Sequence, residues 1–310
     1  MSTHLIVGAG PVGTTTALRL GNAGESVVVA SRSGTGPQHR NIDLKKVDAN
    51  SAADLAALAT SNNASTIINC VNPPYTSWDR DWPPIAAAFL HAAKVSGAGL
   101  VTMSNLYGYG PTHQRMRADT PLDAKGPKGR VRADMWRNAL AAHEAGDVKV
   151  VEVRASDFYG PEVVDANMGE RVVPRLLKRK GVQLLGSADV AHSFSYMPDV
   201  AAVVAAVALD PSSWGRAWLV PSIETTQRGL VTAFATAAGQ PKAKISILPA
   251  TAMKLLRLVV PMIRALGEIQ YQFAAPFVVD ASDTSTRFGL HATDIATAAQ
   301  ETVAWWKSRP

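Results

Sequence analysis

The chain has 310 residues, of which 47% are hydrophobic and 18% are charged, and its formal net charge is +6. This composition excludes a disordered chain, a collagen-like repeat and a small scaffold held together by disulfides. The single cysteine, Cys70, can form neither an internal disulfide nor a thiolate metal site, and its apolar surroundings predict a core residue.

The first half of the chain alternates short β-branched runs with longer helical runs. The predicted strands are 3–7, 26–30, 42–47, 66–71, 100–103 and 149–153. The predicted helices are 14–23, 52–59, 85–95 and 131–145, and Pro83 and Pro84 mark the start of the third. Because the strands are apolar on both faces, we expect an α/β fold: a doubly wound parallel sheet covered by helices on each side.

The alternation loosens after residue 160. We expect a basic amphipathic helix over 171–180, an Ala/Val-rich helix over 199–209, and short strands at 218–220 and 245–248. A helix over 253–266 is a candidate dimer face or lid. The pattern predicts a main domain over 1–160, to which a segment of about 190–220 returns, and a smaller mixed α/β domain over 161–310.

A glycine-rich turn, Gly8-Ala9-Gly10-Pro11-Val12-Gly13, joins the first predicted strand to the first predicted helix. In this context the first glycine allows a tight turn, the second lets the backbone approach a pyrophosphate, and the third allows close packing of helix and strand. The start of the helix adds N–H groups that favour an anion. We therefore expect a Rossmann domain that binds a dinucleotide, rather than a purely structural turn.

The end of the second predicted strand indicates which dinucleotide binds. An NAD site usually has an acidic residue there, which binds the 2′-hydroxyl of the ribose. Here the run 27–30 leads into Ser31-Arg32-Ser33 instead. Arg32 can pair with a 2′-phosphate and the two serine hydroxyls can donate to it, so the sequence favours NADP(H).

Four further segments carry recognisable motifs: SNLYGYGP at 104–111, RASDFYGP at 154–161, FSYMPDVA at 194–201 and FGL at 288–290. Together they resemble the extended short-chain dehydrogenase/reductase family, also described as NAD-dependent epimerase/dehydratase-like proteins. The resemblance spans nearly the whole chain. It implies a Rossmann fold, a nicotinamide cofactor and oxidation–reduction at a carbon that carries oxygen.

The sequence departs from that family at the catalytic positions. The resemblance places the family's Tyr-x-x-x-Lys pair where this chain has Lys128 and Arg132. It also places Asn105, directly after Ser104, at the position of the catalytic serine. Val7 stands where the family's glycine motif usually begins. The chain is thus identified as an atypical member.

Reduction of a carbonyl needs a hydride and a proton for the developing alkoxide, and in the family the tyrosine supplies the proton. Lys128 is a poor donor at neutral pH unless it is desolvated, and arginine keeps its proton. Three sources remain open: Tyr107 or Ser104, a bound water, or an acidic hydroxyl of the substrate itself.

Each candidate also has a purely structural interpretation. Asn105 can donate to the carbonyl oxygen or hold the end of its strand. Tyr107 can act or simply pack, Lys128 can act or lie in a solvated turn, and Arg132 can hold the nicotinamide ribose as the family lysine does. The candidate catalytic residues are Ser104, Asn105, Tyr107, Lys128 and Arg132. The residues expected at the cofactor are Gly8, Gly10, Pro11, Val12, Gly13, Ser31, Arg32, Ser33, Val71, Asn72, Arg132, Ser156 and Asp157.

Other classes of site lack their sequence patterns. The 7 histidines show no metal-binding spacing, no GxSxG motif marks a hydrolase, and no aromatic platform for nucleic acid accompanies the basic run 171–180. We expect no export leader and no membrane helix, because the apolar stretch 255–266 is interrupted by Arg257, Pro261 and Arg264. A cytoplasmic protein, monomeric or homodimeric, is expected.

The substrate side is expected to be apolar, with 270–277 as a loop over the ligand. Candidate lining residues, most of them expected in the core, are Trp78, Trp82, Met168, Phe194, Tyr196, Tyr271, Phe273 and Phe277. The main hypothesis is an NADPH-dependent reductase of a bulky, hydrophobic or aromatic ketone or aldehyde, with substrate-assisted protonation as one option. The alternatives are a sugar-nucleotide epimerase or dehydratase, and a catalytically silent NADP-binding sensor.

Overall fold

The computed structural model describes residues 2–248 and 261–309. The chain divides into two units. Unit 1 comprises Met1–Gly110, Pro121–Arg154 and Val200–Trp218, and unit 2 comprises Pro111–Thr120, Ala155–Asp199 and Leu219–Pro310. The chain therefore crosses between the units several times, so neither unit is a single continuous segment.

A seven-stranded sheet forms the centre of unit 1, in the order β10-β6-β5-β4-β1-β2-β3. The pairs β1–β2, β1–β4, β2–β3 and β4–β5 are parallel. The strands are β1 (Thr3–Val7), β2 (Ser26–Ser31), β3 (Ile42–Lys46), β4 (Ala64–Asn69), β5 (Gly99–Asn105), β6 (Val150–Ala155) and β10 (Ala217–Leu219). The strand order reverses between β1 and β4, and open α/β sheets bind ligands outside the carboxyl ends of the strands at such a point.

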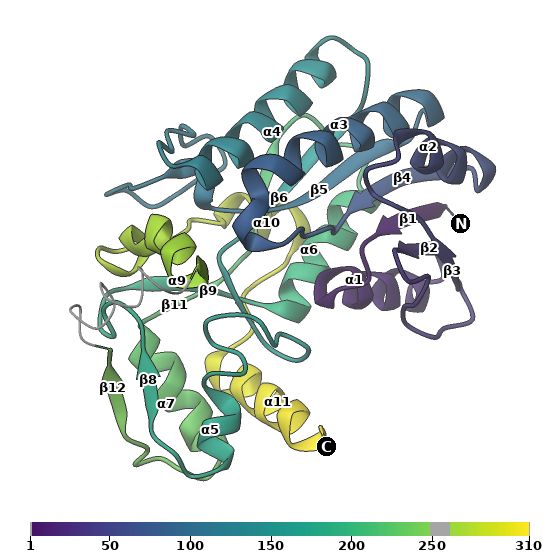
Figure 1. Ribbon diagram of the computed structural model, residues 1–310. Helices are drawn as coiled ribbons and strands as arrows, with labels where there is room; N and C mark the ends of the chain where they lie inside the picture. Colours follow the sequence, from purple (N-terminus) through teal and green to yellow (C-terminus); the bar gives the residue numbers. More distant parts are fainter. Residues whose placement is uncertain (1, 249–260, 310) are drawn as a thin grey trace. The chain divides into compact units, whose positions relative to one another are not determined.

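Helices cover both faces of this sheet, which confirms the predicted fold class. Figure 1 shows α2, α3 and α4 on one face and α1 and α6 on the other. The elements are α1 (Pro11–Asn22), α2 (Ala52–Ser61), η1 (Tyr75–Ser77), α3 (Trp78–Ser96), η2 (Tyr107–Tyr109), α4 (Pro127–Glu144) and α6 (Met197–Leu209). The apolar faces of α2, α3 and α4 share one core cluster with strand residues such as Leu5, Val28 and Ile67.

Helix α3 begins earlier than the sequence predicts. Pro83 and Pro84 lie inside it instead of at its start, and the helix begins at Trp78. Because Trp78 and Trp82 are one helical turn apart, this earlier start buries both indole rings on the same face. Acidic residues in the first turn and a hydrogen bond from Ser77 to Asp81 further stabilise the early start.

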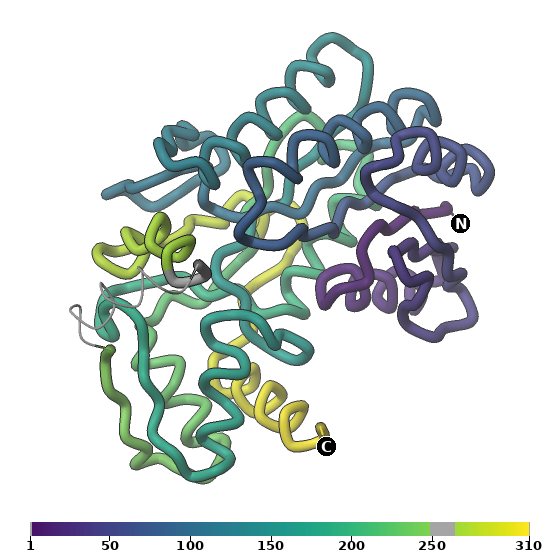
Figure 2. The backbone as a smooth tube through the Cα atoms, viewed as in Figure 1, coloured from purple at the N-terminus to yellow at the C-terminus, as the bar shows by residue number. Residues whose placement is uncertain are grey.

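Unit 2 contains two small sheets, β11-β9-β7 and β12-β8. Its elements are β7 (Asp157–Tyr159), α5 (Val173–Leu177), β8 (Val182–Leu184), β9 (His192–Tyr196), β11 (Ile223–Thr225), α7 (Gln227–Ala237), β12 (Ile245–Ile247), α9 (Pro261–Leu266), η3 (Gly267–Phe273), α10 (Ser282–Phe288) and α11 (Ile295–Ser308). Helices α5, α7 and α11 lie side by side, as the tube in Figure 2 also shows. Their core includes Phe194, Tyr196 and Phe234.

Three expectations about local structure are wrong. The basic run 171–180 forms only the five-residue helix α5, because the chain turns at Arg179, whose φ is 55°. Residues 270–273 belong to the 3₁₀ helix η3 instead of an open loop. Cys70 is half-buried instead of lying in the core, although burial raises the pKa of its thiol to about 12.

Some expectations fall partly or wholly outside the described residues. Of the helix expected over 253–266, only α9 lies within them. Within residues 2–248 and 261–309, no helix is long and apolar enough to cross a membrane. The same residues contain no group of three or more His, Cys, Asp or Glu side chains that could hold a metal ion.

Candidate active site

The three glycines of the turn after β1 have different surroundings. Gly8 has a φ of +110°, and a Cβ there would lie 2.6 Å from the carbonyl oxygen of Cys70. A Cβ on Gly13 would lie 1.8 Å from the carbonyl oxygen of Gly8. A Cβ on Gly10 would meet no atom within 4 Å. The chain's own packing thus requires glycine at the first and third positions, while the second leaves open space beside the backbone.

Helix α1 begins directly at this open space. Gly10 is its N-cap and has no side chain to bond the first N–H groups, and Pro11 follows as the first helical residue. The first turn contains no acidic residue. The N–H groups of Val12 and Gly13 therefore face no competing carboxylate of their own turn, and the residues present fit the pyrophosphate of a dinucleotide.

The turn after β2 is rich in hydroxyl groups. Ser31 Oγ donates to the carbonyl oxygen of Thr35 at 2.9 Å, and the hydroxyls of Ser33 and Thr35 are 2.6 Å apart. Arg32 is exposed and forms no ion pair or hydrogen bond with a residue of the described part of the chain. Hydrogen bonds from Asn50 lower the pKa of Asp48, and the charge of Arg32 makes a smaller contribution in the same direction.

The residues after β4 lie at the carboxyl end of the neighbouring strand. Asn69 is buried, and its Oδ1 accepts a hydrogen bond from the N–H of Val71 at 3.1 Å. Val71 is half-buried and Asn72 is exposed. A contact of these two residues with a cofactor stays a prediction.

At the end of β5, Asn105 adopts the structural role that the sequence left open. Its Oδ1 accepts a hydrogen bond from the N–H of Tyr107 at 3.0 Å, which shapes the turn into η2. Its Nδ2 bonds to no residue within the described ranges, so a donor remains for a ligand. Ser104, the preceding residue, is buried, whereas Tyr107 is half-exposed.

Arg132 is buried between two tryptophans. Its guanidinium carbon lies 4.6 Å from the ring centroid of Trp78 and 4.1 Å from that of Trp82. The residue is only 6% exposed, and its Nε and Nη1 have no hydrogen-bond partner in the part of the chain that the structure describes. Burial lowers the pKa of Arg132 to about 10, so the side chain stays charged at neutral pH.

Tyr107 belongs to the same stack. Its ring centroid lies 5.7 Å from that of Trp78, the indole that also contacts Arg132. The ring of Tyr75 packs against both Trp78 and Tyr107, and the ammonium of Lys128 lies 4.9 Å above it. Lys128 and Arg132, the two cations that the resemblance places at the family's Tyr-x-x-x-Lys pair, are thus both held over aromatic rings. We call Tyr75, Trp78, Trp82, Tyr107, Lys128 and Arg132 the cation–aromatic stack.

Electrostatic interactions partly oppose the effect of burial on Arg132. The negative charge of Glu152 raises the pKa of Arg132, and a smaller contribution comes from Tyr107. Arg132 and Tyr107 therefore interact electrostatically as well as contacting the same indole ring of Trp78.

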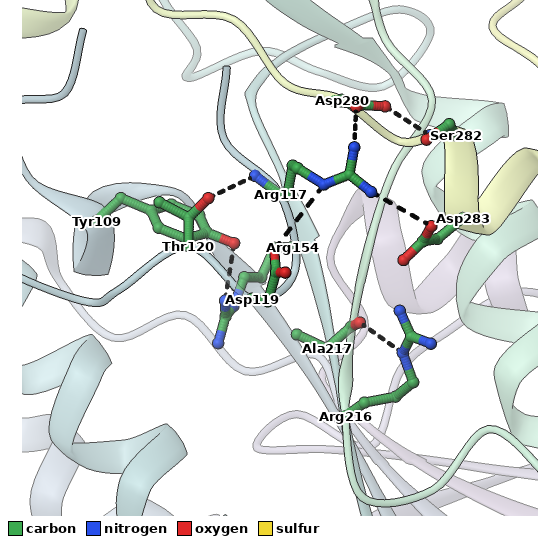
Figure 3. Close-up of polar contacts among 10 residues, drawn as sticks. All are labelled: Tyr109, Arg117, Asp119, Thr120, Arg154, Arg216, Ala217, Asp280, Ser282 and Asp283. Atoms are coloured by element: carbon green, nitrogen blue, oxygen red, sulfur yellow. Dashed lines mark hydrogen bonds and ion pairs between the residues drawn. The ribbon is translucent and has the colours of Figure 1, made fainter. Parts of the chain in front are cut away.

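A second buried arginine in unit 1 is paired with a carboxylate. Arg154 donates to Glu152 at 2.5 Å and to the hydroxyl of Tyr109 at 2.7 Å, the latter bond drawn in Figure 3. Burial lowers the pKa of Arg154, but Glu152 and Tyr109 outweigh it and the net shift is upward. Arg154 thus differs from Arg132 in having a buried carboxylate and a phenol as hydrogen-bond partners.

Two predicted cofactor residues lie in unit 2. Ser156 is buried, and its N–H donates to Ser195 Oγ at 2.9 Å. A carboxylate oxygen of Asp157 lies 2.8 Å from Nε2 of His192, which is 1% exposed. Nδ1 of His192 lies 3.1 Å from the carbonyl oxygen of Gln272 and must donate to it.

Sequence reasoning missed several of these partners. The i, i+4 spacing of Trp78 and Trp82 could have shown that both rings share a helix face, but nothing local relates that face to Arg132. The pairing of Asp157 with His192 has no local signal, because the two residues lie on different strands. Glu152 and Arg154 alternate on one strand, and that period of two could have indicated their pairing.

Comparisons with known proteins agree with this architecture. The profile described as "NAD dependent epimerase/dehydratase family" matches residues 4–219. The chain is similar in structure to dTDP-glucose 4,6-dehydratase from Bacillus anthracis in complex with NAD, with a TM-score of 0.80 at 17% identity over 100% of this chain and 97% of that chain.

Two epimerases give comparable matches. UDP-glucose 4-epimerase from Thermotoga maritima with UDP-glucose has a TM-score of 0.78 at 14% identity over 98% of each chain. UDP-glucose 4-epimerase from Thermus thermophilus with NAD has a TM-score of 0.76 at 17% identity over 99% of this chain and 100% of that chain. A search of curated proteins finds no matching sequence. At such identities the structural matches establish the fold.

Proposed function

Because the chain belongs to the NAD-dependent epimerase/dehydratase family, we propose that it is an NADP(H)-dependent oxidoreductase that reduces a bulky, hydrophobic or aromatic ketone or aldehyde. One observation carries the proposal: Tyr107 and the buried, unpaired Arg132 contact the same indole ring of Trp78. A buried cation without a hydrogen-bond partner costs free energy. A bound ligand, or negative charge that forms during a reaction, would offset this cost.

The residues of unit 1 fit a phosphorylated dinucleotide. The open space at Gly10 and the uncapped start of α1 suit its pyrophosphate, and Arg32 with the hydroxyl of Ser33 suits a 2′-phosphate. Ser31 would donate to the phosphate in exchange for its hydrogen bond to the carbonyl oxygen of Thr35. The remaining predicted cofactor contacts, at Val71, Asn72, Ser156 and Asp157, belong to the same proposal. When bound, the reduced nicotinamide supplies the hydride that adds to the carbonyl carbon.

Tyr107 is proposed as the proton donor. Its O–H bond breaks as a new O–H bond forms on the substrate oxygen, so the carbonyl becomes an alcohol and Tyr107 becomes a phenolate. Arg132 stabilises that phenolate, because its charge is desolvated and close enough to interact with Tyr107. Water then returns a proton to Tyr107. Ser104 and an acidic hydroxyl of the substrate stay alternative donors.

Asn105 and Lys128 are proposed to assist. The free Nδ2 of Asn105 donates to the carbonyl oxygen, which makes the carbonyl carbon more electrophilic. Lys128 adds a second positive charge to the stack, over the ring of Tyr75. The N–H groups of Arg132 at Nε and Nη1, which have no partner among the described residues, can also donate to the nicotinamide ribose, as the family lysine does.

Epimerisation or dehydration of a sugar nucleotide is the second candidate function. The solved structures similar to this chain favour it, since they include a dTDP-glucose dehydratase and UDP-glucose epimerases. The two candidates differ in cofactor balance. A reductase consumes one NADPH for each product, whereas an epimerase or dehydratase recovers its hydride and leaves the cofactor pool unchanged.

The test is a turnover assay with NADPH and a panel of bulky aromatic ketones and aldehydes, together with UDP-glucose and dTDP-glucose. We expect loss of nicotinamide absorbance in step with alcohol formation. Tyr107→Phe is expected to lower kcat by about 100-fold or more while leaving the Kd for NADPH unchanged. Tyr75→Phe, which removes a hydroxyl from the same stack, is the matched control and keeps activity within a few-fold.

The other outcomes are distinct. A changed sugar nucleotide without net loss of NADPH establishes the second candidate. Tight NADPH binding with no conversion of any compound identifies the silent sensor and overturns both enzymatic proposals. Full activity of Tyr107→Phe assigns proton donation to Ser104, water or the substrate.

A further inference from the structure

Four basic side chains gather around one pocket of unit 2. The pocket has a volume of about 320 Å³, and Arg179, Lys180, Lys242 and Lys244 line it. No aspartate or glutamate is among its lining residues. A concave surface with this charge differs from a flat basic patch, because its walls can surround an anion from several sides.

Two segments distant in sequence build the pocket. One follows α5, and the other connects α7 to β12. The parallel pairing of β8 with β12 joins them, with Ile245 opposite Val182, and the N–H of Val182 donates to the carbonyl oxygen of Lys244 at 2.9 Å. The backbone of both walls is therefore fixed by the fold, and it places the four exposed basic residues around the pocket without a ligand.

Arg179 occupies a position that favours glycine. Helix α5 ends in a Schellman motif, in which the N–H of Lys180 bonds to the carbonyl of Arg175 and Arg179 adopts a φ of 55°. Helix α7 ends in the same motif beside the same pocket, and there the corresponding residue is Gly239, with a φ of +72°. A side chain in this conformation is strained, so the arginine is not explained by the turn.

The charge of the pocket is not balanced nearby. The sequence has no aspartate or glutamate between 171 and 188 or between 225 and 267. None of the four cations forms an ion pair with a carboxylate in the described ranges. The carboxyl ends of α5 and α7 carry partial negative charge, but two helix ends together amount to at most about one charge, so about three of the four positive charges remain to be matched.

We propose that this pocket binds a small anion carrying two or more phosphate groups, using residues other than those of the phosphate loop after β1. Arginine and lysine are the residues that recognise phosphate, and four of them match the charge of a di- or triphosphate. The volume lies at the lower end of small-molecule pockets, which span roughly 300–1,000 Å³. Such a volume suits a free ligand better than a membrane surface.

The test is a calorimetric titration of the full-length protein, saturated with NADPH, with inorganic tripolyphosphate at about 50 mM salt. Saturation with NADPH occupies the proposed cofactor site, so that tripolyphosphate bound there does not contribute to the measurement. We expect one saturable site with micromolar affinity that weakens as salt is added. Lys242→Glu with Lys244→Glu is expected to weaken binding at least tenfold. The control pair Lys149→Glu with Lys307→Glu changes the charge equally outside the pocket and shifts affinity less than twofold.

Arg179→Gly separates binding from folding. Glycine relieves the strained turn, so the Tm stays the same or rises, while tripolyphosphate binds at least threefold more weakly. No saturable binding below millimolar concentration overturns the proposal, and so does a control pair that loses as much affinity as the pocket pair. Binding to vesicles of anionic lipid that tripolyphosphate does not displace assigns the pocket to a membrane instead. Failure to bind NADPH contradicts the proposed function alone, because the pocket variants still report on this site.

Discussion

The guanidinium of Arg132 lies 4.1 Å from the ring centroid of Trp82, in a site where its Nε and Nη1 have no hydrogen-bond partner among the described residues. Stacking on an indole compensates a buried cation only in part, because it satisfies none of the N–H donors. The position therefore carries a cost to stability that a ligand, or a negative charge formed during the reaction, would offset.

Replacing Arg132 by methionine is expected to separate stability from activity. Methionine fills a similar volume between the indoles and removes the unpaired charge, so the free energy of unfolding should change by less than about 2 kcal/mol. Turnover should fall at least tenfold, because the phenolate of Tyr107 loses its cation. Thermal unfolding and kcat/KM, measured on the same preparation, check this. A large loss of stability with activity intact would show a structural role.

The paired arginine should respond in the opposite way. Arg154→Met leaves Glu152, which is 4% exposed at its side chain, as a buried carboxylate without its cation and removes the hydrogen bond to Tyr109. Breaking such a pair costs about 3–5 kcal/mol. Denaturant titration is the measurement. If Arg154→Met and Arg132→Met lowered the free energy of unfolding equally, pairing with Glu152 would not distinguish Arg154 from Arg132.

Arg32→Asp is expected to reverse the cofactor preference. The change removes the cation proposed for the 2′-phosphate and supplies the carboxylate that binds a 2′-hydroxyl. The Kd for NADP⁺ should rise by about 10- to 100-fold and that for NAD⁺ should fall, as measured by calorimetry. Arg40→Asp, in an exposed position of the same connection, is the control. Unchanged NADP⁺ affinity in Arg32→Asp would rule out this role of Arg32.

Cys70 provides a pH-dependent test of the packing under the glycine-rich turn after β1. Burial raises the pKa of its thiol from 9.0 to about 12, so at pH 8 alkylation should be about a thousandfold slower in the folded than in the unfolded protein. The unfolded chain loses this proton near pH 9 while the folded chain keeps it. Stability from this group is therefore complete below pH 9 and declines as the pH rises toward 12. Rapid labelling at pH 8 without unfolding would contradict this packing.

The contact between Asp157 and His192 in unit 2 predicts that substituting one of them lowers stability more than substituting the other. In Asp157→Asn the amide can donate to Nε2 of His192, whose Nδ1 still donates to Gln272, so every partner is kept. In His192→Phe the carboxylate of Asp157 loses the imidazole nitrogen that lies 2.8 Å away, at a position packed against the rings of Phe273 and Phe277. We expect the second variant to lose about 1–3 kcal/mol more, measured by denaturant unfolding. Equal losses would show that the imidazole of His192 does not stabilise Asp157.

The sequence predicts the features of this structure that depend on neighbouring residues, and it misses those that depend on residues far apart in the chain. The turn at Gly8, Gly10 and Gly13 is local, and so are the strands of unit 1, so pattern and turn chemistry were enough to predict them. The early start of α3 depends on burying Trp78 and Trp82 against other elements, which a proline signal cannot reveal. The helix predicted over 171–180 ends early because Arg179 adopts the left-handed conformation of a helix cap, a conformation that usually requires glycine and that an arginine does not indicate.

The candidate active site divides in the same way. The resemblance to the family identified Lys128 and Arg132 as the replaced pair, but their aromatic partners come from α3 and η1 and become neighbours only on folding. Asn105 had two interpretations of equal weight: the hydrogen bond from the N–H of Tyr107 to its Oδ1 shows the structural contact, and its Nδ2 still leaves a donor for a ligand. For Lys128 and Arg132, contacts between distant segments supplied what spacing alone left open.

The most direct test of the central claim is deuterium transfer from NADPH labelled at C4 of the nicotinamide. The labelled cofactor is incubated with wild-type protein, Tyr107→Phe or Arg132→Met and the ketone and aldehyde panel, and the products are analysed by mass spectrometry. We predict deuterium on the carbinol carbon of a product alcohol with wild-type protein, at a rate at least about tenfold lower in both variants. Absence of deuterium from every product, despite tight binding of NADPH, would contradict the account.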